Sequence, residues 1–178
     1  KPDVVFHLAA QISVPASVED PLHDARTNIL ASLHLLELAK KYACKKFVFA
    51  QSGGAIYGDN ALLPTPEHAL QQPISPYGVS KFAFEKYLES YFALHGVAYT
   101  SLRLANIYGP RQMMNGEGEG GVIAIFTTKL LRHEGVIING DGSATRDFVF
   151  VDDVVDAFLK AADSDYVGSV NISTGKEI

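Results

Sequence analysis

The chain has 178 residues, 47% hydrophobic and 20% charged, which fits a globular fold with a substantial core. Its net charge of −5 argues against a nucleic-acid binder that contacts the phosphate backbone, because such a protein needs a basic face. The one cysteine, Cys44, cannot form an internal disulfide and indicates a reducing compartment. No apolar run approaches the roughly 18 residues of a membrane span. We therefore expect a cytoplasmic protein that binds neither nucleic acid nor a membrane.

The first part of the chain alternates apolar runs with helical patterns. Three runs have the composition of buried parallel strands, and they cover residues 4–8, 47–50 and 99–104. Asp20 and Pro21 predict the N-cap and first residue of a helix over 21–42. A second helix over 76–94 is predicted between Ser75 and Gly96. This alternation predicts an α/β fold with a doubly wound parallel sheet.

The pattern changes after Pro110. We expect a helix at 122–133, strands at 136–138 and 170–173, and a helix to about Ala162 capped by Asp152 or Asp153. A turn at 140–142 is expected to lead the chain toward the segment 146–151. Residues 1–110 are predicted to form one domain. Residues 111–178 are predicted to form mostly a smaller lobe that is interleaved with the end of the sheet.

Tyr77 and Lys81 carry the most chemical information in the sequence. They lie four residues apart at the start of a predicted helix, so their side chains share one face. A phenol has a pKa of about 10, and bringing it near 7 requires roughly 4 kcal/mol of preferential stabilisation of the phenolate. We expect the Lys81 ammonium and the helix N-terminus to contribute to that stabilisation. Such a pair is suited to moving a proton on or off a hydroxyl group.

A second Tyr-x-x-x-Lys sequence, Tyr42 to Lys46, is interpreted differently. It closes the helix over 21–42 and leads into an apolar strand. Its lysines are expected to lie near a helix C-terminus, where cations are mildly favourable. We therefore assign it no chemistry.

Two segments surround the Tyr77–Lys81 pair. Ser52-Gly-Gly-Ala-Ile-Tyr-Gly58 follows the second predicted strand, and Leu102-Arg-Leu-Ala-Asn-Ile-Tyr-Gly-Pro110 follows the helix. In this order the segments resemble the extended short-chain dehydrogenase/reductase family, and in particular its nucleotide-sugar epimerases. The resemblance covers essentially all of the chain. It implies a Rossmann-like sheet whose first βαβ part, with the glycine-rich dinucleotide fingerprint, is absent, so we expect the chain to be a fragment or the ordered portion of a longer protein.

A literal Gly-x-Gly-x-x-Gly pattern occurs at 116–121, but we do not interpret it as that fingerprint. The fingerprint needs its first glycine in the tight turn that leaves a strand. Here Gly116 lies well beyond the predicted strand end at Leu104, and Glu117 and Glu119 would repel a pyrophosphate. A loop on the substrate side is expected instead.

The resemblance implies roles for particular residues. In the family the tyrosine takes a proton from a sugar hydroxyl while a hydride leaves the same carbon for NAD. The lysine lowers the pKa of the tyrosine and binds the nicotinamide ribose, and a Ser or Thr orients the reacting oxygen. The positive charge of the nicotinamide is expected to add to the stabilisation of the phenolate. Tyr77 and Lys81 match in position, whereas the hydroxyl is Ser52, one position before its usual place at Gly53. The remaining NAD-binding candidates are Leu8, Ala9, Ala10 and Asn28.

The substrate side is implied by the same resemblance. Asn106 matches a substrate-contacting asparagine, Arg146 matches an arginine that contacts the substrate pyrophosphate, and Arg111 is a further candidate. Dehydratases of the family carry an Asp-Glu pair where this chain has Gly54 and Ala55. The implied activity is therefore NAD-dependent epimerisation of a nucleotide sugar, most often a UDP-hexose at the 4-position. An NDP-keto-sugar reductase or dehydrogenase and a non-catalytic NAD(H) sensor remain alternatives.

The two long helices show more apolar surface than one core face can use. On the helix over 76–94, Phe84, Leu88 and Tyr91 lie on one side while Phe82 and Phe92 point elsewhere. Relatives pair these two helices with their copies across a two-fold axis. We therefore expect a homodimer through helices 21–42 and 76–94, with Phe84 and Leu88 at the interface. The alternative is that the protein's own sheet and its missing N-terminal part cover both faces. The six histidines show no metal-ligand spacing, so no metal site is expected.

Overall fold

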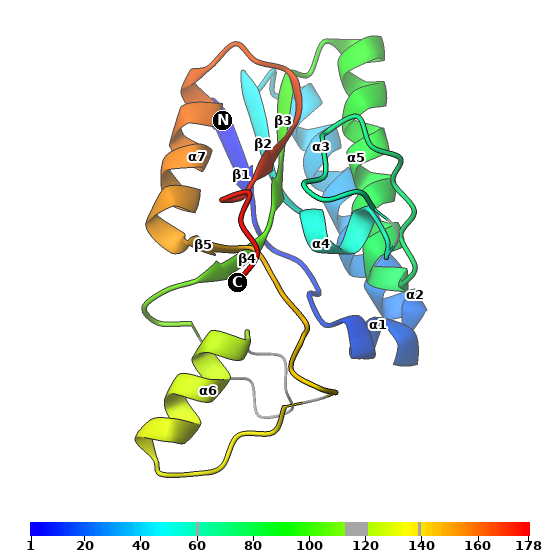
Figure 1. The fold of residues 1–178 in the computed structure, drawn as a ribbon. Helices are drawn as coiled ribbons and strands as arrows, with labels where there is room; N and C mark the ends of the chain where they lie inside the picture. Colours follow the sequence, from blue (N-terminus) through cyan, green and yellow to red (C-terminus); the bar gives the residue numbers. More distant parts are fainter. Residues whose placement is uncertain (60, 113–120, 139) are drawn as a thin grey trace.

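The computed structural model describes residues 1–59, 61–112, 121–138 and 140–178. Four parallel strands form the main sheet in the order β1-β2-β3-β6. They are β1 (Val4–His7), β2 (Lys46–Ser52), β3 (Tyr99–Leu104) and β6 (Gly168–Ile172). Helices lie on both faces of this sheet (Figure 1), so the predicted doubly wound α/β architecture is confirmed. The glycine pattern at 116–121 falls almost entirely outside the described residues.

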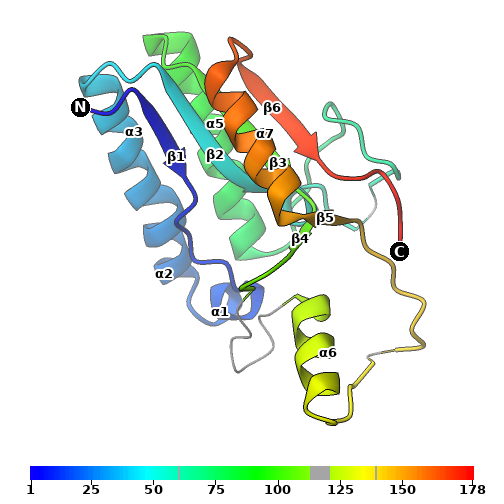
Figure 2. The same cartoon turned by 90° about the vertical axis from the view of Figure 1, so that its left-hand side faces the viewer.

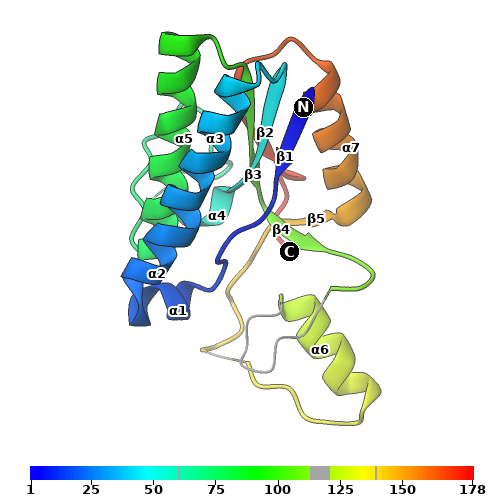
Figure 3. The same cartoon turned by 180° about the vertical axis from the view of Figure 1, so that it is seen from behind.

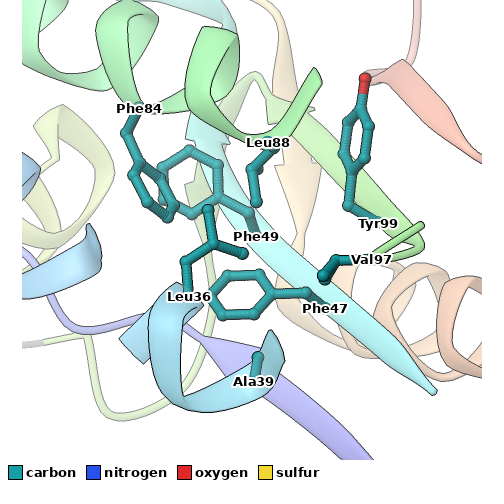
Figure 4. Packing of buried hydrophobic residues seen from close by; sticks show 8 residues of the cluster. All are labelled: Leu36, Ala39, Phe47, Phe49, Phe84, Leu88, Val97 and Tyr99. Atoms are coloured by element: carbon teal, nitrogen blue, oxygen red, sulfur yellow. The ribbon is translucent and has the colours of Figure 1, made fainter. Parts of the chain in front are cut away.

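The central strand β2 explains why both faces are covered. Its side chains alternate, so that Phe47 and Phe49 enter one core while Val48 enters the other. The first core also contains Phe84 and Leu88, which pack against the two phenylalanines (Figure 4). The second core consists of Val48, Leu102, Leu104, Val149, Val154, Phe158 and Ala161.

The helix predicted over 21–42 has the expected extent but not a uniform geometry. It comprises α2 (Pro21–Ala25), a π-helical turn η1 (Arg26–Ala31) and α3 (Ser32–Lys41). Asp20 is its N-cap, with Oδ1 accepting from the His23 backbone N–H at 2.9 Å, and Tyr42 is its C-cap. The π turn was not predicted. It places Asn28 in a wider turn of the helix, and such turns are frequent at functional sites.

Helix α5 (Pro76–His95) carries the Tyr77–Lys81 pair and follows its prediction closely. Ser75 caps its N-terminus by accepting from the Gly78 backbone N–H, and Gly96 ends it in the left-handed conformation with φ of 69°. Two short helices were missed, α1 (Val14–Glu19) and α4 (Gly53–Ile56). A small parallel pair, β4 (Asn106–Tyr108) with β5 (Phe148–Phe150), was also missed.

The second half differs from its prediction in two places. Residues 136–138 are not in a strand, and Ile137 and Ile138 are exposed. The strand that pairs with β4 is β5. Helix α7 (Val151–Asp163) has Phe150 as its N-cap, so the prediction that Asp152 or Asp153 caps it is wrong. The strand β5 leads directly into α7. The carboxylates of Asp152 and Asp153 lie in the first turn of this helix, where they interact favourably with the positive end of the helix dipole.

Helix α7 packs on β2 and β3 from the face opposite α3 and α5, as Figure 2 and Figure 3 show from two sides. Helix α6 (Val122–Leu131) stands apart, beyond the ends of the strands (Figure 1). None of the helices in the described residues is both long and apolar enough to span a membrane.

Candidate functional site

A cleft of about 1000 Å³ opens where the sheet strands end. Leu8 follows β1, Ser52 ends β2, and Leu104 ends β3, and all three line it. Its opposite wall includes residues of α6 together with Ile137, Ile138, Gly142, Ala144 and Arg146. In open α/β sheets, ligands bind outside the carboxyl ends of the strands, so this position is the one expected for a binding site.

Two short helices hold the Tyr77 end of α5 in place. The Tyr77 backbone N–H donates to Ser17 Oγ of α1 at 3.1 Å. Gly78 packs directly on α4, because a Cβ atom added there would lie 2.5 Å from the Ala55 carbonyl oxygen. The Tyr77 side chain is thus positioned from both sides, and it lines the cleft together with Ser52 and Lys81.

Lys81 is buried at the base of the cleft. Its Nζ donates to the Ala50 carbonyl oxygen at 2.6 Å and lies 4.0 Å from the centre of the Phe49 ring. Burial lowers the pKa of Lys81 to about 7, and the carboxylate of Asp24 opposes that shift. A lysine of this kind can exchange its proton near neutral pH.

The protein groups alone do not lower the pKa of Tyr77. Burial raises the pKa of Tyr77, the hydrogen bond with Ser52 acts in the lowering direction, and Asp24 raises it further. The physical reason is that desolvation penalises the phenolate, while Lys81 is itself desolvated and loses its proton first. A phenolate at neutral pH therefore needs an additional positive charge in the cleft.

The displaced hydroxyl has a steric explanation. Gly53 packs on the end of β3, and a Cβ there would lie 3.1 Å from the Leu104 carbonyl oxygen and 3.3 Å from that of Arg103. A serine at position 53 would be crowded, so the hydroxyl next to Tyr77 is that of Ser52. Ser52 lies at the N-cap position of α4 but makes no capping bond with its side chain, which leaves the hydroxyl available to the cleft.

Sequence reasoning missed Gln51, which connects the two catalytic elements. Its amide oxygen accepts from the Ser52 backbone N–H at 2.9 Å, and its amide nitrogen donates to the Lys81 carbonyl oxygen at 2.9 Å. The same nitrogen lies 3.4 Å from Glu85 Oε2. Glu85 forms a fully buried ion pair with Arg103, at 2.5 Å. A polar residue at the end of an apolar strand was the available signal.

The predicted NAD-binding residues occupy different positions. Leu8 and Ala10 line the cleft, and Ala9 between them is exposed. Asn28 is 2% exposed, and its side chain holds the chain after β1: Oδ1 accepts from the Gln11 backbone N–H and Nδ2 donates to the Gln11 carbonyl oxygen, both at 2.9 Å. Asn28 thus shapes the loop next to the cleft.

The predicted substrate residues separate into two groups. Asn106 and Arg146 line the cleft, on the side facing α6. Asn106 Nδ2 donates to the Asp147 carbonyl oxygen at 3.1 Å, and the exposed Arg146 guanidinium donates to the Thr145 carbonyl oxygen at 2.7 Å. Arg111 instead lines a separate cavity of about 290 Å³ between β4 and α6.

Comparison with known proteins places this geometry in a family. The model of the NAD dependent epimerase/dehydratase family matches residues 1–173. A UDP-glucose 4-epimerase of Mycolicibacterium smegmatis is 47% identical over 178 residues, covering 99% of this chain and 56% of the relative. The chain therefore spans a little over half the length of that relative.

Solved structures agree. A UDP-glucose 4-epimerase from Thermotoga maritima with UDP-glucose is 53% identical with a TM-score of 0.95, covering 99% of this chain and 57% of the other. A UDP-glucose 4-epimerase from Thermus thermophilus in complex with NAD is 42% identical with a TM-score of 0.90, covering 99% of this chain and 58% of the other.

Proposed function

Because this chain belongs to the NAD dependent epimerase/dehydratase family, we propose that it catalyses the epimerisation of a UDP-hexose at the 4-position. The observation that carries the proposal is the meeting of Ser52, Tyr77 and Lys81 at one cleft. Shortly after Ser52, Gly54 and Ala55 occupy the positions where a dehydratase would need an acid and a base, and neither side chain can move a proton. Oxidation and reduction at a single carbon are what these residues can support.

The groups in the cleft divide the reaction between them. Tyr77, as the phenolate, accepts the proton of the sugar hydroxyl, and Ser52 donates a hydrogen bond that orients the same oxygen. NAD, when bound, supplies the hydride acceptor and a positive ring charge. In the return direction, Tyr77 gives the proton back after the keto sugar has turned its other face. When Lys81 is protonated, its positive charge favours the phenolate form of Tyr77.

The described residues fit such a cofactor on one side. Leu8 and Ala10 give the cleft an apolar wall suited to a flat aromatic group, and Lys81 lies in the same cleft. On the facing side, Arg146 is exposed within the cleft and is suited to the pyrophosphate of a nucleotide sugar, since a guanidinium binds phosphate oxygens in a bidentate manner.

The test is an assay of the full-length protein on UDP-glucose, UDP-GlcNAc and their 4-epimers. We expect interconversion without added oxidant or reductant, with NAD retained through purification, because epimerisation regenerates its cofactor in each cycle. Turnover of a keto sugar that consumes added NADH in equal amounts would support a reductase instead. Retained NAD without conversion of any of these sugars would support the sensor.

We also propose a homodimer through helices 21–42 and 76–94, in a reducing compartment such as the cytoplasm, where Cys44 stays a free thiol. Phe84 and Leu88 were wrongly chosen as interface residues, since both are 0% exposed in the core. The helices lie side by side (Figure 3) and expose other apolar side chains. Among them are Leu30, Leu38, Val79, Tyr87 and Phe92.

The interface is tested by sedimentation at micromolar concentration. Leu38→Glu and Tyr87→Glu should convert the dimer to a monomer, because each places a charge on the proposed contact. Leu131→Glu, at a 77% exposed position on α6, is the matched control and should leave the dimer intact. A monomeric wild-type protein would contradict this proposal.

A further inference from the structure

Asp24, on α2, is a buried carboxylate that the mechanism above does not use. It is 1% exposed, and its Oδ1 accepts from Gln11 Nε2 at 2.8 Å and from Asn28 Nδ2 at 3.0 Å. Asn28 Nδ2 also donates to Ser80 Oγ at 3.2 Å, and Ser80 Oγ donates to the Tyr77 carbonyl oxygen at 2.9 Å. Asp24 therefore belongs to one hydrogen-bonded cluster with the helix turn that carries Tyr77.

The second oxygen of this carboxylate shows that hydrogen bonding alone does not explain the residue. Asp24 Oδ2 is buried without a hydrogen-bond partner among the residues that the structure describes. Both contacts of Oδ1 could equally be accepted by the oxygen of a neutral amide. A buried unpaired carboxylate oxygen costs stability, and each such group in a folded protein calls for a specific explanation.

The electrostatic surroundings supply that explanation. The titratable groups that Asp24 influences are Tyr77 and Lys81 of α5, whose pKa values it raises. The neighbouring α1 and η1 present Ser17 and Asn28 as their buried polar groups.

Of the other charged residues on the neighbouring elements, Glu19 on α1, His23 on α2 itself and Arg26 on η1 are exposed to solvent. On α5, Glu85 is buried but is paired with Arg103. Tyr77 and Lys81 are the groups whose pKa values Asp24 raises.

We propose that Asp24 is a positioning residue of the catalytic site, which organises the Gln11–Asn28–Ser80 cluster and supplies a negative charge that favours the protonated form of buried Lys81 beside Tyr77. The inference rests on the proposed function and deepens it. Lys81 is desolvated, and its Nζ contacts are a carbonyl oxygen and an aromatic ring, neither of which carries a full charge. Asp24 therefore offsets the burial that would otherwise neutralise the ammonium.

The decisive variant is Asp24→Asn, which keeps the size and the Oδ1 contacts but removes the charge. Because a nearby anion favours the protonated amine, its removal lowers the pKa of Lys81. The basic limb of the pH profile of kcat for UDP-glucose, where Lys81 loses its proton, should move down by about one pH unit. Asp20→Asn is the control: Asp20 is an exposed N-cap four residues away, asparagine caps equally well, and the limb should not move.

A second readout does not depend on activity. Lys81 lines the cleft, so the rate at which a small acylating reagent modifies it can be followed against pH by mass spectrometry of the Lys81 peptide. We expect the midpoint of that titration to fall by the same amount in Asp24→Asn and to return toward the wild-type value in Asp24→Glu, which restores the charge.

The outcomes separate the two proposals. An unchanged labelling midpoint in folded Asp24→Asn would overturn the role of Asp24, whatever the activity. Equal shifts in Asp24→Asn and Asp20→Asn would also overturn it, because they would show a general charge effect. If the wild-type protein converts no nucleotide sugar, the proposed function fails, while the labelling midpoint still decides the role of Asp24.

Discussion

Helices α5 and α6 use apolar side chains for two different purposes. In α5, Phe84 and Leu88 are fully buried between the sheet and α3, where they contribute to the core (Figure 4). In α6, none of the ten residues is buried in the described part of the chain, although most of them are apolar. Val122, Ile125 and Phe126 line the cleft instead.

The contrast shows that apolar composition alone does not determine whether a helix stabilises a fold. Burial against the sheet gives α5 the rigidity that a catalytic pair needs, because its backbone is fixed from both sides. An apolar helix that faces a cleft provides binding surface, which a ligand can cover. The expected effects of substitution therefore differ sharply between the two regions, and the following variants test that difference.

The largest effect on stability is expected at the ion pair beneath α5. Arg103 Nη2 lies 2.5 Å from Glu85 Oε1, and its Nη1 donates to the Tyr57 hydroxyl and to the Glu67 carbonyl oxygen, both at 2.8 Å. Arg103→Leu leaves the Glu85 carboxylate buried without its cation, which should cost about 3–5 kcal/mol of unfolding free energy. Denaturation with urea measures this loss.

Two further variants make the test specific. Lys86→Leu breaks the exposed pair with Glu89 and should change stability by less than about 1 kcal/mol. Combining Arg103→Leu with Glu85→Leu should recover part of the loss, because no unpaired charge remains. Equal losses at the buried and the exposed pair would contradict the assigned importance of burial.

The next effect is on catalysis. Tyr77→Phe should lower turnover at least about 10²-fold, the lower end for losing a positioned acid–base group, with little change in stability. Tyr42→Phe removes a hydroxyl from the other Tyr-x-x-x-Lys sequence, at the C-cap of α3, and should leave turnover nearly intact. Steady-state kinetics of the two variants decide the assignment, and similar losses in both would refute it.

A smaller effect is expected at the displaced hydroxyl. Ser52→Ala removes one neutral hydrogen bond to the reacting oxygen, worth about 1 kcal/mol, and should reduce kcat up to about tenfold with a smaller change in KM. Unchanged kinetics would show that backbone groups at Gly53 and Gly54, or water, orient the substrate instead.

The parts of the fold that were predicted correctly are those with local causes. The apolar run of β2 and the Ser75 and Gly96 caps of α5 are patterns of neighbouring residues, so these elements were predicted to within a few residues. The strand expected at 136–138 is absent. A strand needs a pairing partner, and β4 pairs with β5 instead. Ser13 followed by Pro15 was a usable signal for the missed α1.

The site divides in the same way. Tyr77 and Lys81 were recognisable from their helical spacing together with the segments 52–58 and 102–110, since the spacing alone also fits Tyr42 and Lys46. Gln51 and Asp24 were missed because their roles depend on contacts between elements far apart in the sequence. The degree to which burial raises the pKa of Tyr77 could not be predicted, since the extent of burial is not visible in a sequence.

The smallest effect is expected on α6, where the comparison with α5 is most direct. Leu131 is 77% exposed, so Leu131→Ala removes little buried area and should change the free energy of unfolding by less than about 0.5 kcal/mol. The same substitution at Leu88, which is 0% exposed, leaves a cavity in the core and should cost about 2–5 kcal/mol. Both variants can be measured by urea denaturation of the full-length protein. A loss above about 2 kcal/mol at Leu131 would mean that this face of α6 is buried in the complete protein, and that α6 shares the structural role of α5.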